Sequence, residues 1–229
     1  AVLNNLGLIH DELGQYETAL TFYQQSLTLR ERYNLPRRAI SLHNIGFAYD
    51  QLQQDDRALT YYQQALALQQ QNNDLVGIAI TRNNLGLLLS DRGQHHLALQ
   101  ELNTALALFQ QLGNRPSIGN TLDSIATVYK NQQQFDQAET YYRRAIATLK
   151  ATENRTTLGI VLTNLGDLYE RMGQLDKAVA TYQEAIDSVF ETILADLQGE
   201  ELRSLFADKH ADAYARLINL LWNQRRYEE

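Results

Sequence analysis

A three-residue pattern recurs five times along this chain of 229 residues, and this repetition constrains the fold more strongly than any other feature. It begins as Asn5-Leu6-Gly7 and returns as Asn44-Ile45-Gly46, Asn84-Leu85-Gly86, Ser124-Ile125-Ala126 and Asn164-Leu165-Gly166. The copies are spaced 39, 40, 40 and 40 residues apart. Such a period is typical of arrays in which each repeat is one supersecondary unit that buries its apolar face against its neighbours.

Small and large residues follow one another in a fixed order within each repeat. Four of the patterns end in glycine, at Gly7, Gly46, Gly86 and Gly166. Twelve residues after each pattern comes an alanine, at Ala19, Ala58, Ala98, Ala138 and Ala178, and four residues later most repeats have a tyrosine, at Tyr23, Tyr62, Tyr142 and Tyr182. Apolar residues recur at helical spacing, so each repeat is expected to form two amphipathic helices packed through these glycines and alanines.

Breaks in the helical pattern indicate where the helices end. Gly14, Gly93 and Gly173 fall between the two expected helices of their repeats, where glycine can adopt the positive φ that ends a helix. Gln53 and Gln133 occupy the same place in the second and fourth repeats. Pro36 and Pro116 occupy equivalent positions between repeats and are expected in the first turn of the following helix.

These residues resemble the tetratricopeptide repeat, in the forty-residue variant found in kinesin light chains and bacterial signalling regulators. The resemblance implies an all-α, right-handed superhelical solenoid. It covers residues 1 to 187, with repeats at about 1–34, 35–74, 75–114, 115–154 and 155–187. Residues 188–229 are then expected to form a helical extension with a capping helix. The chain also lacks an initiator methionine and begins inside an expected helix, which predicts that it is part of a longer protein.

The C-terminal segment has a second interpretation. Residues 201–206 and 214–221 resemble the junction at which tetratricopeptide repeats precede a caspase-like protease domain of the CHAT type in bacterial proteins. That resemblance implies that this chain is the sensor or regulatory arm of such a protein, with the protease further along. A simple capping helix explains the same apolar spacing, and both interpretations stay open.

The resemblance also implies that the first helix of each repeat lines a concave groove and that the first residue of each pattern points into it. Asn5, Asn44, Asn84, Ser124 and Asn164 would form this ladder. An amide is both donor and acceptor, which suits the backbone of an extended peptide. Alternatively, the asparagines bond to neighbouring helices and only fix the superhelix. The sequence leaves both roles open.

Residues one and two turns beyond the ladder predict the character of the peptide. Phe47 and Leu87 would make one part of the groove apolar, Asp50 and Asp91 would make it acidic, and Lys130 and Arg171 would add positive charge toward the C-terminal repeats. A neutral or basic segment of a protein partner is therefore favoured. His43 adjoins the ladder and is the one histidine placed to sense pH there.

Composition argues against other functions. The net charge of −7 disfavours nucleic acid, and the absence of cysteine excludes disulfides, zinc thiolates and cysteine nucleophiles. The sequence contains no long apolar run, no signal peptide, no clustered histidines and no phosphate loop, so we expect a cytoplasmic protein without membrane spans, metal, cofactor or enzymatic activity. The leading function is a protein-binding scaffold, and the alternatives are a self-assembling scaffold and the sensor repeats of a transcription regulator.

Overall fold

The computed structural model describes residues 2–190, 193, 200, 204 and 211–226. Within these ranges the secondary structure is helical, with no strand, so the predicted all-α class is confirmed. Of the stretch 201–206 singled out above, residues 201–203 and 205–206 lie outside the described residues. The chain divides into two compact units, Ala1–Leu112 and Gly113–Glu229, which we call the first and second unit and describe separately.

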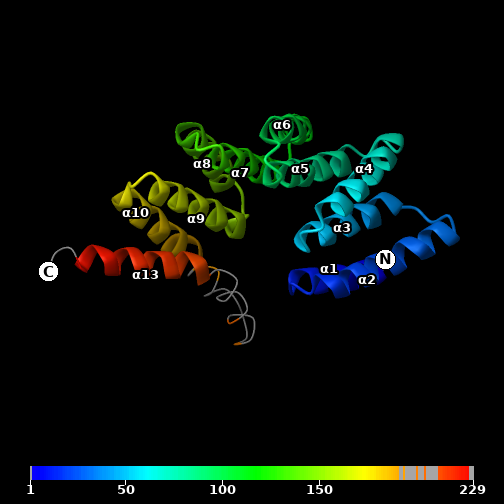
Figure 1. Ribbon diagram of the computed structural model, residues 1–229, viewed down its shortest axis with the longest axis horizontal. Coiled ribbons are helices and arrows are strands. Elements are labelled where there is room, and N and C mark those ends of the chain that lie inside the picture. The colour runs from blue at the N-terminus through cyan, green and yellow to red at the C-terminus, as the bar shows by residue number, and fades with distance from the viewer. Residues whose placement is uncertain (1, 191–192, 194–199, 201–203, 205–210, 227–229) are drawn as a thin grey trace. The chain divides into compact units, whose positions relative to one another are not determined.

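The first unit consists of three helical hairpins (Figure 1). Its helices are α1 (Val2–Glu12), α2 (Tyr16–Arg32), α3 (Arg38–Gln51), α4 (Asp55–Gln71), α5 (Leu75–Asp91) and α6 (His95–Gln111). Each odd-numbered helix pairs with the helix that follows it, and α2 contacts α3 as α4 contacts α5. The first helices of the second and third hairpins, α3 and α5, also touch one another.

The second unit repeats this arrangement. Its helices are α7 (Arg115–Asn131), α8 (Phe135–Lys150), α9 (Arg155–Arg171), α10 (Leu175–Ala185), the π-helical turn η1 (Ile186–Phe190) and α13 (Ala211–Arg226). Hairpins α7–α8 and α9–α10 lie against each other through α8 and α9, and α13 packs on α10. The helix α13 therefore covers a face of the last hairpin, where a capping helix was expected.

Tyrosines on the second helices pack against glycines on the first helices. Tyr62 and Tyr182 have no exposed surface. Tyr62 lies opposite Gly46, where an added Cβ would be 2.8 Å from Cδ1 of the ring. Tyr182 lies opposite Gly166, where an added Cβ would be 2.5 Å from Cε1 of the ring. Only glycine allows this approach. The repeated alanines are also fully buried: Ala19, Ala58, Ala98, Ala138 and Ala178.

The helix ends follow the sequence with one exception. Gly14, Gly93 and Gly173 have φ near +70°, and Gln53 and Gln133 adopt the same left-handed conformation at +57° and +59°. Pro116 lies in the first turn of α7, which Asn114 caps. Pro36 does not lie in a first turn: Arg37 adopts a φ of +68°, so α3 begins only at Arg38. The carbonyl of Pro36 instead accepts a hydrogen bond from Arg30.

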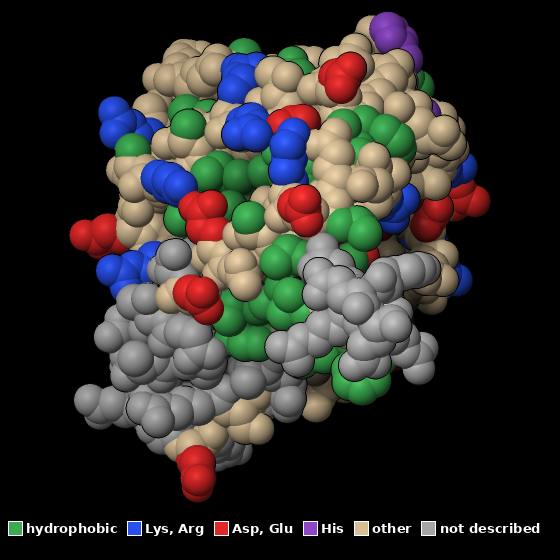
Figure 2. Space-filling model, turned by 90° about the vertical axis from the view of Figure 1, so that its left-hand side faces the viewer, with side chains coloured by type: hydrophobic (Ala, Val, Ile, Leu, Met, Phe, Trp, Pro, Cys, Tyr) green, Lys and Arg blue, Asp and Glu red, His purple; other side chains and the backbone are tan. Residues whose placement is uncertain are grey.

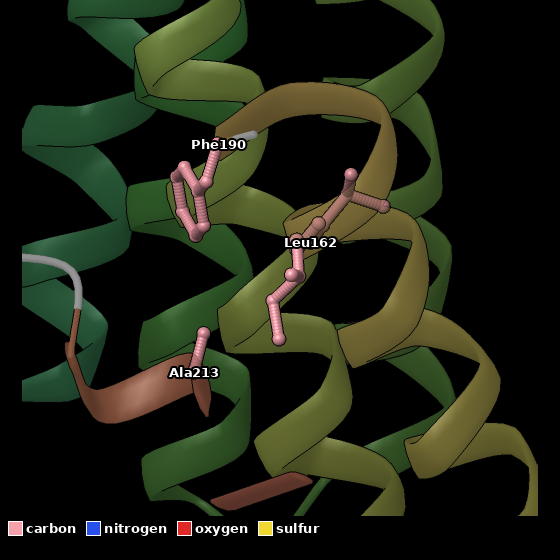
Figure 3. Packing of buried hydrophobic residues seen from close by; sticks show 5 residues of the cluster. Leu162, Phe190 and Ala213 are labelled. Carbon is pink, nitrogen blue, oxygen red and sulfur yellow. The ribbon is translucent and has the colours of Figure 1, made fainter. Parts of the chain in front are cut away.

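A separate apolar cluster joins the end of the last hairpin to α13 (Figure 3). Phe190 in η1 is 1% exposed, Leu162 in α9 is 2% exposed and Ala213 in α13 is 2% exposed. The π-helical turn adds one residue to the turn of the backbone and so changes the direction in which the following side chains point. Phe190 thereby reaches Gly159, which leaves room for its ring.

Candidate functional site

In the first unit the ladder asparagines bond to neighbouring first helices. Asn44 Nδ2 donates to Oδ1 of Asn4 across 3.5 Å, and Asn84 Nδ2 donates to Nε2 of His43 across 3.5 Å. Asn44 is 8% exposed, Asn84 is partly buried and Asn5 is exposed. Each bond joins a ladder residue to the side chain just before the ladder position of the previous repeat, so the amides link consecutive hairpins.

The second unit has one bond of the same kind. Asn164 Nδ2 donates to Oδ1 of Asp123 across 2.9 Å, whereas the Ser124 hydroxyl donates to the carbonyl oxygen of Asn120 in its own helix. Asp123 lies in α7, and burial raises its pKa to about 6. The amide of Asn164 is therefore the donor that satisfies a buried carboxyl.

Exposed isoleucines lie one helical turn before the ladder, and the sequence reasoning missed them. Ile40 and Ile80 in the first unit are 39% and 40% exposed, and Ile160 in the second is 40% exposed. Phe47 and Leu87, one turn after the ladder, are partly buried. Residues four apart share one face of a helix. The fixed spacing of isoleucine and asparagine was therefore the signal that could have revealed an apolar strip beside the amides.

Carboxylates without partner cations line the first helices of the first unit. Asp11 and Asp50 accept hydrogen bonds from Tyr23 and Tyr62 across 3.2 and 3.3 Å. Burial raises the pKa of Asp50 to about 6 and also raises the pKa of Asp11 and Asp91. No lysine, arginine or histidine within residues 2–112 forms an ion pair with these three carboxylates.

Two carboxylates of α9 in the second unit, Asp167 and Glu170, have partner cations. Asp167 accepts from Lys130 Nζ across 2.9 Å, from Arg171 Nε across 3.1 Å and from Arg216 Nη1 across 2.9 Å. Although burial acts to raise it, the bond and charge of Lys130 together with both arginines hold the pKa of Asp167 below its ordinary value. The two cations expected in the groove are thus engaged by Asp167.

Arg216 was not foreseen as part of this network. It lies in α13 and contacts Asp167 and also Glu170, at 3.3 Å from Oε2. Its position 49 residues beyond Asp167 gives no local signal in the sequence. Figure 2 shows the molecule from the left-hand side of Figure 1, where basic and acidic side chains lie next to one another with apolar side chains between them.

The histidine beside the ladder is partly buried in the first unit. His43 Nδ1 lies 2.9 Å from the Thr81 hydroxyl, and its Nε2 accepts from Asn84, which assigns the proton to Nδ1. Burial lowers the pKa of His43 to about 4. A neutral ring with both nitrogens engaged is a structural link between α3 and α5.

The described residues contain no group of three or more His, Asp or Glu side chains placed to hold a metal ion. None of the helices in the described part of the chain combines the length and the apolar character that a membrane span needs.

Comparison with known proteins identifies the repeat. The tetratricopeptide repeat model matches residues 1–71, 77–151 and 121–189. No curated protein sequence matches the chain.

Three solved structures show the same fold. Kinesin light chain repeats of Podosopora anserina align with a TM-score of 0.60 at 18% identity over 86% of this chain and 96% of that one. A Rap protein complexed with Competence and Sporulation Factor aligns at 0.70 and 18% identity, over 98% and 75%. NprR in complex with its cognate peptide NprX aligns at 0.71 and 15% identity, over 98% and 60%. The chain belongs to the tetratricopeptide repeat family.

Proposed function

We propose that this chain is a non-enzymatic binding scaffold whose first unit holds an extended, neutral to basic segment of a partner protein along its first helices, α1, α3 and α5. The observation that carries the proposal is the set of uncompensated carboxylates on these helices. Asp50 is partly buried and Asp91 is exposed, and neither has a partner cation within residues 2–112. A lysine or arginine of the partner would supply that charge.

The apolar strip and the amides would provide the remaining contacts. Ile40 and Ile80 expose about two fifths of their surface beside Asn44 and Asn84. An extended segment alternates its side chains, so it can direct apolar residues at the isoleucines while its backbone meets the amides. The Nδ2 groups of Asn44 and Asn84 already bond to Asn4 and His43. The peptide backbone would therefore contact the amide of exposed Asn5 and the amide oxygen of Asn84.

The comparisons add support at the level of the fold. Rap and NprR were each solved with a signalling factor or peptide bound, and both share this arrangement of hairpins. Their low identity transfers no residue contacts to this chain. The acidic positions therefore rest on the geometry of this chain alone.

The test uses peptides of defined charge. We expect a fluorescently labelled six-residue peptide of alternating lysine and leucine to bind the full chain more tightly than its glutamate and leucine counterpart. The double variant Asp50→Asn with Asp91→Asn should weaken the lysine peptide at least fivefold in fluorescence anisotropy at 0.1 M salt, because two carboxylates are lost.

A matched control carries the same change of charge elsewhere. Asp136→Asn with Asp176→Asn removes two exposed carboxylates from the second unit and should leave binding within a factor of two. Equal loss in both double variants would show a mere effect of net charge and would refute the site. Unchanged binding in the first double variant would refute it as well.

We also propose that the module is the regulatory arm of a larger, cytoplasmic bacterial signalling protein with a CHAT-type effector. The support is the resemblance of residues 214–221, which lie in α13, while most of the companion stretch 201–206 lies outside the described residues. The parent gene beyond Glu229 tests this directly. A coding sequence there without the protease His and Cys would end the proposal.

Self-assembly is the second candidate, and α13 favours it. Ile218 and Trp222 are 64% and 63% exposed and lie one helical turn apart. Light scattering over a range of protein concentrations distinguishes this candidate from peptide binding. A mass that doubles with concentration in the wild type but not in Ile218→Ser would support it, and a constant monomer mass would exclude it.

A further inference from the structure

The hairpins contain a recurring pair of stacked rings on the side away from the ladder residues. A ring on the first helix stacks on a ring twelve residues later on the second helix. The ring centroids are 5.3 Å apart for His10 and Phe22, 5.5 Å for Tyr49 and Tyr61, and 5.3 Å for Tyr129 and Tyr141. The interplanar angles of 15° to 25° make these offset stacks, which stabilise the hairpin beyond simple burial.

The fifth repeat keeps the first ring and lacks the second. Tyr169 in α9 corresponds to Tyr49, but Thr181 in α10 takes the place of Tyr61. The surroundings are otherwise retained: Lys177 lies 5.3 Å from the Tyr169 ring centroid, as Arg57 lies 5.4 Å from that of Tyr49. One aromatic ring is therefore missing from an otherwise conserved arrangement within the chain.

A second contact confirms that the two places are equivalent. Arg143 in α8 donates to the Tyr169 hydroxyl across 2.9 Å, and Gln24 in α2 donates to the Tyr49 hydroxyl across 3.3 Å. Tyr169 stays only 2% exposed, because Arg143 and Lys177 lie against it. Tyr169 therefore has little free surface, and Thr181 stands where the second ring of the other hairpins lies.

An open pocket of about 280 Å³ occupies this place, between α8, α9 and α10. We call it the outer pocket. Its apolar part is formed by Ile146, Ala147 and Leu162, and Thr181 forms one side. Sites for whole cofactors or drug-sized ligands are about 300–1,000 Å³, so this volume suits a single large side chain.

The rim of the outer pocket carries more positive than negative charge. Lys150 Nζ lies 2.7 Å from Glu184 Oε1, and both side chains are about half exposed. Arg143 Nε lies 2.9 Å from Glu139 Oε1 and is 60% exposed. Of the charged residues that line the pocket, two are basic, Arg143 and Lys150, and one is acidic, Glu184.

The counterpart in the first unit shows where an added charge would lie. Burial raises the pKa of Tyr61; the charges of Tyr49 and Glu31 add to this shift and the charge of Arg57 opposes it. The position equivalent to Glu31 on α8 is Lys150. Because Lys150 lines the outer pocket, a ring seated there would have a cation beside it, where the first unit has the acid Glu31.

We propose that the outer pocket binds an aromatic side chain of a partner protein, with an acidic residue next to it in the partner's sequence. The ring takes the place that Phe22, Tyr61 and Tyr141 fill in their own hairpins, and the carboxylate pairs with Lys150. This site lies on the second unit and does not depend on the groove proposed above, so either can fail without the other.

The experiment compares dipeptides on the full, ¹⁵N-labelled chain. We expect acetyl-Phe-Asp-amide to shift the amide resonances of Ala147, Leu162 and Thr181 in NMR titrations. Acetyl-Ala-Asp-amide should produce no saturable shift, and acetyl-Phe-Asn-amide should bind at least threefold more weakly. Equal effects of the Phe-Asp and Ala-Asp peptides would overturn the proposal.

Variants then fill or preserve the pocket. Thr181→Tyr should supply the missing ring, raise the melting temperature and weaken the Phe-Asp peptide at least tenfold. Thr181→Val keeps the side-chain size and should bind within a factor of two of the wild type. Lys150→Gln should remove the difference between the Phe-Asp and Phe-Asn peptides. Undiminished binding in Thr181→Tyr, at any melting temperature, would place the peptide elsewhere and overturn the site.

Discussion

In the first unit Asp50 and Asp91 lie on the first helices and have no partner cation within residues 2–112, whereas in the second unit Asp167 bonds to Lys130, Arg171 and Arg216. The hairpins themselves are alike: tyrosines pack on glycines in both units, and the alanines at the helix contacts are fully buried in both. The same scaffold therefore carries an open acidic face in one unit and a closed ion network in the other. Packing residues set the fold, and the residues between them set the charge of each unit's first helices.

The largest expected effect comes from opening the closed network. Asp167→Asn removes the carboxylate that Lys130, Arg171 and Arg216 share. Lys130, whose side chain is 13% exposed, then lies near two arginines without a partner carboxylate. We expect a loss of about 2–3 kcal/mol in the free energy of unfolding by urea, below the range for fully buried pairs because both arginines are more than a third exposed. Asp176→Asn, which is exposed on α10, is the control, and equal stability of both variants would contradict the network's role.

A packing change should affect both units equally. Ala98→Leu in the first unit and Ala138→Leu in the second both insert three carbons where the alanine is 0% exposed. Overpacking of this kind costs about 1–3 kcal/mol, so we expect about 2 kcal/mol for each by urea denaturation. Unchanged stability in either variant would show that the small residue is not required there, and the two units would then differ in packing as well as charge.

The ladder amides should differ in their contribution to stability. Asn164→Ala removes the 2.9 Å donor to buried Asp123 and should cost about 1.5 kcal/mol, because the acceptor is left without that partner. Asn44→Ala removes only a 3.5 Å bond to Asn4 and should cost about 0.5 kcal/mol. Thermal unfolding followed by circular dichroism measures both. A larger loss for Asn44→Ala would reverse the comparison.

Much of the fold could be predicted because it depends on local, repeated residues. The triplet glycines and the turn residues each act within one hairpin, as Gly46 against Tyr62 and the left-handed Gln53 show. The candidate sites depend on residues far apart. Arg216 reaches Asp167 from 49 residues away, and the pocket beside Thr181 exists because of a ring that is absent. Neither feature forms a periodic pattern.

The remaining prediction concerns the open acidic face. The pKa of Asp50 is about 6 in the folded chain and 3.8 ordinarily, because burial disfavours the ionised form. Between these values the folded chain binds more protons than the unfolded chain, so this group's contribution to stability falls as the pH rises through that window. The side chain introduced by Asp50→Asn does not titrate, and its amide oxygen can still accept the hydrogen bond from the Tyr62 hydroxyl.

We therefore expect Asp50→Asn to be more stable than the wild type at pH 8 and equal to it below pH 3.8. Solvent screening of this part-exposed group limits the gain to about 1 kcal/mol. Urea denaturation at several pH values measures the difference, and Asp136→Asn on the exposed face of α8 controls for net charge. A pH-independent difference would mean that Asp50 is not held in a buried, cation-free environment. Because a basic peptide bound beside Asp50 would stabilise the carboxylate, saturating lysine peptide should remove the advantage of the asparagine at pH 8.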